Sequence, residues 1–235
     1  MRKSQAKLFA QYPRHDPEAE WMGRWPSGIE SQHPTVNIAR KEADLNDIGR
    51  LRYELYIERD GKRYSSVEYA ARQFLEPIDR VSLNFQARHM GRLLAAVRLV
   101  RAEDAILDPH LGLLVEAYRP CDIARTVVNS RLAVLPEHRA RAVIIPMFQE
   151  VYRCGLLAGA KECLLGTRDE LVSIFERFGF VRTETVVVDP VAKHMNVLCL
   201  QLDNVEYLTR INSPLAPIAR FMLLGEMHKI GKVCA

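Results

Sequence analysis

The order of apolar segments in the second half of the chain is the feature that most constrains its fold. Residues 122–135 (DIARTVVNSRLAVL) form a β-branched, strand-like run, and residues 140–160 place apolar side chains at helical spacing. Residues 161–167 (KECLLGT) are again typical of a strand, and a shorter helix is expected over residues 169–179. Strands and helices that alternate in this way indicate an α/β domain, because the helices cover the sheet that the strands form.

An antiparallel hairpin is predicted before these elements. Residues 81–102 (VSLNFQARHMGRLLAAVRLVRA) consist of two alternating runs about the basic turn RHMGR. A hairpin joined to alternating strands and helices indicates a mixed sheet. We therefore expect one mixed α/β domain, with a central mixed β-sheet and helices on both faces.

The remaining elements follow from the same patterns. Residues 1–34 are polar and have no clear period, so we interpret them as a partly ordered extension to a single domain over residues 35–235. A helix is predicted over residues 43–61, with a glycine stop at Gly61. Further elements are expected as a strand at 35–40, a helix at 66–75, strands at 182–190 and 196–202, and a C-terminal helical extension, interrupted by prolines, at 205–229.

The composition argues against several classes of protein. With 48% hydrophobic and 26% charged residues the chain has an ordinary globular composition, and no apolar run reaches the roughly 20 residues that span a bilayer. The net charge of +4 is not interleaved with aromatic residues, so it suits an acidic partner better than nucleic acid. The five cysteines have no metal-binding spacing, and the N-terminus has no secretory apolar core. We therefore expect a cytoplasmic protein with reduced thiols and no metal site.

Three motifs, taken in order, resemble the GNAT superfamily of acyltransferases. They are the hairpin GRLLAAVRLV, the strand–turn–helix SRLAVLPEHRARAVIIPMFQEV, and the helix end IFERFGFV. The resemblance spans residues 36–202 and implies a GNAT-like fold. Within that superfamily the segments LRYELYIERDG, LEPID and NSRLAVLPEHR are similar to the FeeM-type N-acyl amino acid synthases and to their relatives, the LuxI-type acyl-homoserine lactone synthases.

The resemblance to the LuxI-type enzymes implies a set of site residues. The matching positions hold Arg52, Tyr56, Glu76, Asp79, Arg98, Ser130 and Arg131. One position departs from the pattern, because Val128 stands where those enzymes carry a glutamate. This departure counts against a lactone-forming enzyme and leaves the general base unassigned.

The residues themselves suggest roles for Arg98 and for the strand around Ser130. An arginine on an otherwise apolar strand face needs a partner, because a buried unpaired charge is costly. Arg98 is therefore expected either to pair with Glu76 or Asp79 or to bind the carboxylate of an amino acid, and both can hold. Strict alternation places Ser130 and Arg131 on opposite faces of their strand, where Ser130 is either a donor to the reacting thioester or a simple sheet serine.

The resemblance also implies that the central strand separates from its parallel neighbour. Backbone N–H groups near Leu132 and Val134 would then contact the pantetheine arm and stabilise the thioester oxygen as charge develops on it. No tightly bound cofactor is implied. The co-substrate would be an acyl-phosphopantetheine thioester, carried by acyl carrier protein or by coenzyme A.

The turn after this strand indicates which donor is used. Glycines that would let a diphosphate approach the helix are replaced by Ala142 and Ile144. Cations gather where the helix dipole disfavours them, at His138, Arg139 and Arg141. An anionic partner, acyl carrier protein, would explain the arrangement; Glu137 and solvent screening are the alternative explanation.

We therefore expect an N-acyltransferase that moves a long-chain acyl group from acyl carrier protein to the amine of an amino acid. Glu76 or Asp79 is the candidate base, with His194 a further possibility unless it is an ordinary surface histidine. The alternatives are an acyl-homoserine lactone synthase, a coenzyme-A-dependent N-acetyltransferase, and a non-enzymatic module that binds an acylated carrier. The amino acid, the acyl length and the oligomeric state do not follow from the sequence.

Overall fold

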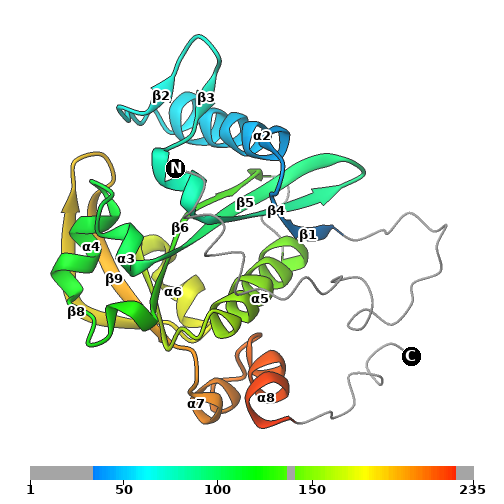
Figure 1. Cartoon of the computed structure of the whole chain (residues 1–235), viewed down its shortest axis with the longest axis vertical. Coiled ribbons are helices and arrows are strands. Elements are labelled where there is room, and N and C mark those ends of the chain that lie inside the picture. The colour runs from blue at the N-terminus through cyan, green and yellow to red at the C-terminus, as the bar shows by residue number, and fades with distance from the viewer. Residues whose placement is uncertain (1–33, 137–140, 226–235) are drawn as a thin grey trace.

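A computed structural model describes residues 34–136 and 141–225. Its centre is a seven-stranded sheet in the order β1-β4-β5-β6-β7-β9-β8 (Figure 1). Only β6 and β7 pair in parallel; the other neighbours are antiparallel. The strands are β1 Thr35–Ile38, β4 Leu83–His89, β5 Arg92–Arg101, β6 Thr126–Val134, β7 Glu162–Thr167, β8 Val181–Asp189 and β9 Lys193–Gln201. This mixed sheet confirms the predicted fold class.

Helices cover both faces of the sheet, as expected. One face packs on the apolar sides of α5 (Arg141–Leu157), α6 (Asp169–Glu176), α7 (Val205–Arg210) and α8 (Ala216–Leu224). The opposite face packs on α2 (Glu42–Arg52), α3 (Ala102–Ala105) and α4 (Leu111–Tyr118). Figure 1 shows α2 on one side of β4 and β5, and α5 on the other.

The helix predicted over residues 66–75 is wrong. The segment instead forms a two-stranded hairpin from β2 (Val67–Glu68) and β3 (Gln73–Phe74), with Arg72 in a left-handed conformation at φ 51°. Phe74 is fully buried and stacks on Tyr64 with 4.6 Å between ring centroids. This aromatic contact with a residue outside the segment outweighs the local helical propensity.

The helix predicted over residues 43–61 is present but changes its winding. After α2 the chain continues as a π-helix, η1 (Tyr53–Arg59), whose end is marked by the bonds from Asp60 N–H to the Leu55 carbonyl and from Lys62 N–H to the Tyr56 carbonyl. Gly61 follows at φ 66°, as the predicted stop requires. π-Helical turns within α-helices are frequently found at functional sites.

Four short elements complete the described chain and were not predicted. They are α3 and α4, which cap the sheet between β5 and β6, and the 3₁₀ turns η2 (Pro77–Val81) and η3 (Ile123–Arg125). Of the predicted N-terminal extension, residues 1–33 lie outside the described part of the chain. No described helix is both long and apolar enough to cross a membrane.

Candidate active site

A β-bulge in β6 builds the site. Arg98 lies opposite Ser130 and Ala96 lies opposite Ala133, so two residues of β6 face one residue of β5. Arg131, the first of these two, has a φ of 55°, which an L-residue adopts only under local strain. The expected alternation is therefore wrong: the extra residue turns Arg131 to the same side as Ser130, toward Glu76.

Five charged side chains meet at this bulge. Arg98 donates to Glu76 Oε2 at 2.9 Å, to Asp79 Oδ1 at 3.2 Å and to Ser130 Oγ at 3.0 Å. Arg131 binds Glu76 through two nitrogens, at 2.7 and 2.5 Å. Arg52, at the end of α2, donates hydrogen bonds to both oxygens of Asp79 at 2.8 and 2.9 Å. The ion pair predicted for Arg98 is confirmed with both carboxylates.

The 3₁₀ turn η2 holds the two carboxylates. Glu76 and Asp79 form a reciprocal cap, in which Glu76 N–H donates to Asp79 Oδ2 at 2.8 Å. Asn84 on β4 fixes the turn further, because it donates to the Asp79 carbonyl at 2.8 Å and accepts from Arg52 at 3.2 Å. These hydrogen bonds of the LEPID segment fix the positions of the Glu76 and Asp79 carboxylates.

The cluster keeps both carboxylates ionised. Burial acts to raise the pKa of Glu76, but the hydrogen bonds and charge of Arg131, together with the charge of Arg98, outweigh it and lower that pKa to about 2. Burial likewise opposes ionisation of Asp79, and the charges of Arg52 and Arg98 still lower its pKa. Such carboxylates are weak proton acceptors near neutral pH, so the geometry favours positioning over base catalysis.

The cluster has one positive charge in excess, since three guanidinium groups face two carboxylates. Arg52 and Arg98 are fully buried, whereas the Arg131 side chain keeps 13% of its surface exposed. Arg131 also donates to Tyr64 Oη at 3.2 Å and lies over that ring. The cluster therefore presents its spare charge through Arg131.

Tyr56 connects the π-helix to β6. Its hydroxyl donates to the carbonyl of Leu132, the second residue of the bulge, at 2.7 Å. Burial raises the pKa of Tyr56 to about 12, although the charges of Arg131 and Arg52 oppose the shift. Tyr56 therefore stays protonated and holds the backbone of β6 in place.

The strands β6 and β7 separate after Val128. They pair only from Thr126 to Val128, against Glu162 to Leu164. Leu135 N–H donates to the Leu94 carbonyl on the β5 side, so the preceding N–H, that of Val134, points to the side that β7 has left. Within the described residues, β6 thus has an unpaired edge at the position expected for the thioester.

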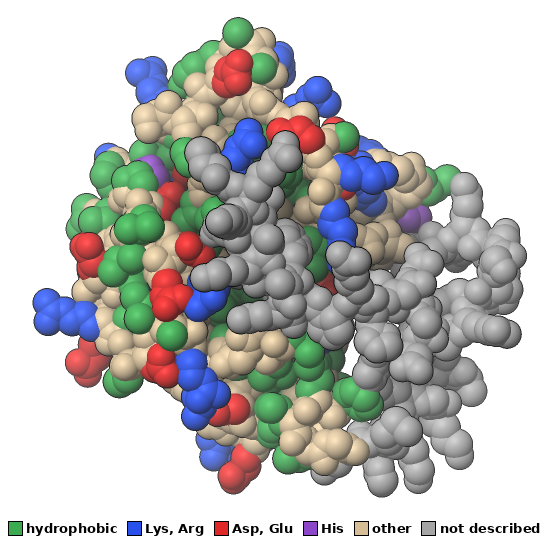
Figure 2. All heavy atoms as spheres, in the orientation of Figure 1, with side chains coloured by type: hydrophobic (Ala, Val, Ile, Leu, Met, Phe, Trp, Pro, Cys, Tyr) green, Lys and Arg blue, Asp and Glu red, His purple; other side chains and the backbone are tan. Residues whose placement is uncertain are grey.

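A cavity of about 470 Å³ opens at the end of this gap, lined by Arg59, Asp60, Lys62, Pro136 and Arg168. Pro136 follows the end of β6 and Arg168 the end of β7, and ligands of open α/β sheets bind beyond the carboxyl ends of such strands. Three of the five lining residues are cations. On the described part of the face in Figure 2, by comparison, Lys and Arg side chains are interspersed with Asp and Glu.

Some predicted residues cannot be placed. His138 and Arg139 lie outside the described residues, and only the backbone of Arg141, the first residue of α5, is described. Val128 is fully buried in an apolar cluster with Leu164 and Val197, so no carboxylate stands there. His194 is exposed on β9. In the part of the chain that the structure describes, no group of His, Cys, Asp or Glu side chains could hold a metal ion.

Sequence reasoning missed several residues near the cluster. Tyr64 and Phe74 form an aromatic wall against Arg131, with Arg131 lying 4.5 and 5.2 Å from their ring centroids. His110 meets the edge of Tyr64 at 5.3 Å and pairs with Asp189. No sequence motif links these residues.

Comparisons with known proteins identify the family and the fold of the chain. Residues 47–203 match the family described as N-acyl amino acid synthase FeeM. No curated protein matches the chain. The structure of FeeM, an N-acyl amino acid synthase from uncultured soil microbes, is similar with a TM-score of 0.57 and 12% identity, over 79% of this chain and 97% of FeeM.

Two acyl-homoserine lactone synthases are also similar in structure. LasI gives a TM-score of 0.57 at 15% identity, over 72% of this chain and 90% of LasI. BjaI, described as coenzyme-A-dependent and solved with SAM and isopentyl-CoA, gives 0.58 at 16% identity, over 77% of this chain and 90% of BjaI. These likenesses confirm the predicted GNAT-like acyltransferase fold.

Proposed function

Because the chain belongs to the N-acyl amino acid synthase FeeM family of acyltransferases, we propose that it acylates the amine of an amino acid with a long-chain acyl group from acyl carrier protein. The cationic cavity at the carboxyl ends of β6 and β7 supports an acyl-phosphopantetheine donor, and the replacement of the helix glycines by Ala142 and Ile144 favours the carrier protein over coenzyme A. A phosphopantetheine phosphate suits this cavity, and the acidic surface of a carrier protein suits its rim.

The acceptor site is assigned to the charged cluster. An amino acid brings one carboxylate, and the cluster has one spare positive charge beside the exposed edge of Arg131. Arg98 contributes from beneath: it is fully buried, and its Nη2 has no hydrogen-bond partner among the described residues. We assign carboxylate recognition to Arg131, with Arg98 and Arg52 fixing the carboxylates that hold it.

The reaction itself is a direct transfer. The amine nitrogen attacks the thioester carbonyl carbon, an amide bond forms, and the carrier thiolate leaves. We assign oxyanion stabilisation to the Val134 N–H on the open edge of β6, and Tyr56 holds the nearby Leu132 carbonyl through a hydrogen bond. Ser130 is engaged by Arg98, so we assign it to orient that arginine rather than to protonate sulfur.

Coenzyme A is the second candidate donor, because BjaI shares this fold and is described as coenzyme-A-dependent. The same cationic cavity would then take a nucleotide phosphate. LasI and BjaI are described as acyl-homoserine lactone synthases. The position of Val128 holds no carboxylate in this chain, and this disfavours lactone formation.

The test compares the reaction rates with the two donors. Purified protein is incubated with a pool of amino acids and with either acyl carrier protein or coenzyme A charged with the same long acyl chain, and amide products are measured by mass spectrometry. We expect N-acyl amino acids at a higher rate from the carrier protein. Equal rates from both donors would contradict the carrier assignment, and the absence of amide from either would contradict the proposed activity.

A further inference from the structure

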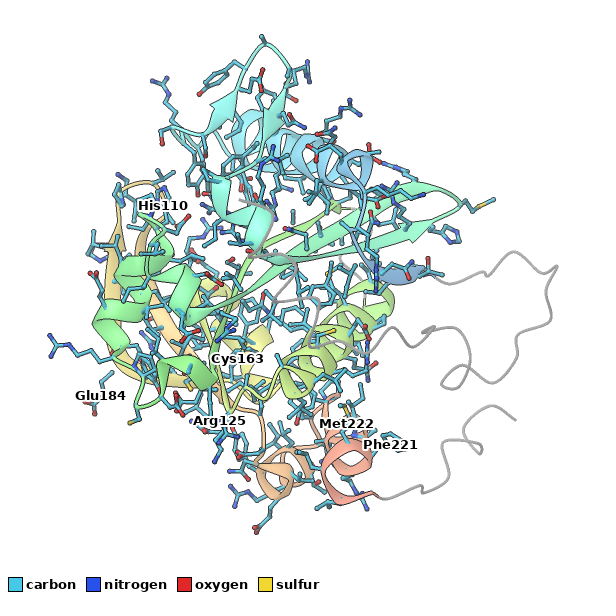
Figure 3. All side chains as sticks on the ribbon, in the orientation of Figure 1. His110, Arg125, Cys163, Glu184, Phe221 and Met222 are labelled. Atoms are coloured by element: carbon cyan, nitrogen blue, oxygen red, sulfur yellow. The ribbon has the colours of Figure 1, made fainter. Side chains whose placement is uncertain are left out.

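His110 and Asp189 form a hydrogen-bonded pair next to the charged cluster. His110 Nδ1 lies 2.6 Å from Asp189 Oδ2, although the two residues are 79 positions apart in the sequence. The other oxygen of Asp189 accepts the backbone N–H groups of Val191 at 2.7 Å and Ala192 at 2.5 Å. The carboxylate is therefore fixed in the turn of the β8–β9 hairpin, and Figure 3 shows His110 beside the tip of that hairpin.

This geometry fixes the tautomer of the imidazole. An ionised Asp189 accepts a hydrogen bond from Nδ1–H, so the neutral imidazole carries its proton on Nδ1 and its lone pair on Nε2. Nε2 has no hydrogen-bond partner in the described part of the chain, and it is not among the buried unpartnered atoms. A carboxylate that orients a histidine with an open Nε2 is the arrangement that activates general bases in many acyl-transfer enzymes.

The pair lies on the face of the sheet that carries the charged cluster. His110 meets the Tyr64 ring edge-on, at 5.3 Å between centroids, and Tyr64 in turn accepts a hydrogen bond from Arg131. Arg131 sits on the bulge of β6, directly before the strand edge assigned to the thioester. Only one aromatic ring therefore separates the imidazole from the residue assigned to the amino acid.

We propose that His110 is the general base of the reaction and that Asp189 is its positioning residue. The proposal rests on the proposed function and fills the role that the cluster carboxylates serve poorly. Nε2 takes the proton of the attacking amine as the C–N bond forms and the C–S bond breaks. The proton then passes to the departing thiolate, so that amide and free thiol are the products and no oxidant or metal is needed.

The charged groups around His110 set its pH range. The hydrogen bond to Asp189 raises the pKa of His110; burial and the charge of Arg131 act against this, and Glu76 supports it. Asp108 on the same loop accepts the backbone N–H of His110 rather than its ring, and Tyr64 is a neutral neighbour because burial raises its pKa. A base must be neutral to act, so the rate should rise with pH through the raised pKa of His110.

The experiment compares three variants in the full chain: His110→Gln, Asp189→Asn, and the control His89→Gln at the far end of β4. We expect His110→Gln to lower kcat by about 10²–10⁴-fold and to abolish the acidic limb of the pH profile. Asp189→Asn should lower kcat less and shift that limb to lower pH, because the pKa of His110 falls when the carboxylate is removed. His89→Gln should behave like the wild type.

Two results would overturn the role of His110. One is a His110→Gln variant that keeps the wild-type kcat and acidic limb; the other is an Asp189→Asn variant whose limb does not move while its thermal unfolding is normal. A wild-type protein that forms no amide from either donor fails differently, because it removes the proposed function itself. A nitrogen NMR titration of the histidine side chains measures the pKa of His110 in the wild type and in Asp189→Asn. The same spectra show whether a variant has merely unfolded.

Discussion

At the scale of single residues, the site is a balance of buried charges. Arg98 and Arg52 have no exposed surface, and each is matched by a carboxylate on the η2 turn. Removing one partner of such a pair leaves a buried charge uncompensated, which typically lowers the free energy of unfolding by about 3–5 kcal/mol. The cluster is therefore as much a condition for folding as a substrate site.

Glu76→Gln tests this balance. The depressed pKa of Glu76, about 2 against an ordinary 4.5, means that its contribution to the free energy of unfolding is complete above pH 4.5 and is lost as the pH falls toward 2. The shift corresponds to a contribution on the order of 3 kcal/mol. We expect Glu76→Gln to be less stable in urea at pH 7 and to lose less stability than the wild type on acidification.

Glu42→Gln is the matched control. Its carboxylate is 66% exposed and lies 3.9 Å from Arg80, so we expect a change of less than about 1 kcal/mol. Parallel stability–pH curves for the wild type and Glu76→Gln would show that the cluster does not hold Glu76 ionised.

At the scale of elements, departures from regular geometry aim the side chains. The bulge in β6 brings Arg131 and Ser130 to one side, and the π-helix η1 carries Tyr56 to Leu132. Gly179, which follows α6 in the FGF sequence, also has an irregular backbone geometry. It has a φ of 106°, and a Cβ there would lie 2.5 Å from Leu208.

Gly179→Ala should therefore cost more stability than Gly61→Ala. Gly61 also has a positive φ, 66°, but a Cβ there meets nothing within 4 Å. Thermal unfolding should show a loss of about 1 kcal/mol for Gly61→Ala and a clearly larger loss for Gly179→Ala, because only the latter adds a clash to the backbone strain. Equal losses would mean that α7 moves aside without cost.

At the scale of the whole molecule, the proposed donor and acceptor sites both lie beside the strand β6. The gap between β6 and β7 ends in the cationic cavity, while the charged cluster lies at the bulge on the face away from α5. A donor that enters the gap and an amino acid held at Arg131 would meet at the free edge of β6.

Arg168→Gln tests the electrostatic part of this arrangement. Removing one of the three cavity cations should raise KM for acyl carrier protein several-fold at low salt and weaken the dependence of KM on ionic strength, with little change in kcat. Arg177→Gln is the control, because this exposed residue follows α6 and does not line the cavity. An Arg168→Gln enzyme with an unchanged KM and salt dependence would exclude the cavity from donor binding.

The sequence by itself predicted a mixed sheet, most of its helices and the pairing of Arg98 with a carboxylate, whereas Arg52 and Arg131 were named only through the family resemblance. Apolar periodicity is a local property, so β5, β6, α5 and β7 could be predicted from their own residues. The need to pair a buried charge led from Arg98 to Glu76 and Asp79.

Only the tertiary structure decided how those residues meet. The turn of residues 66–75 depends on Phe74 stacking against Tyr64, and the side to which Arg131 points depends on one extra residue in the β5–β6 ladder. The pairing of His110 with Asp189 joins a loop to a hairpin that no local pattern connects. Such contacts form between segments that are distant in the sequence, and a short-range pattern carries no information about them.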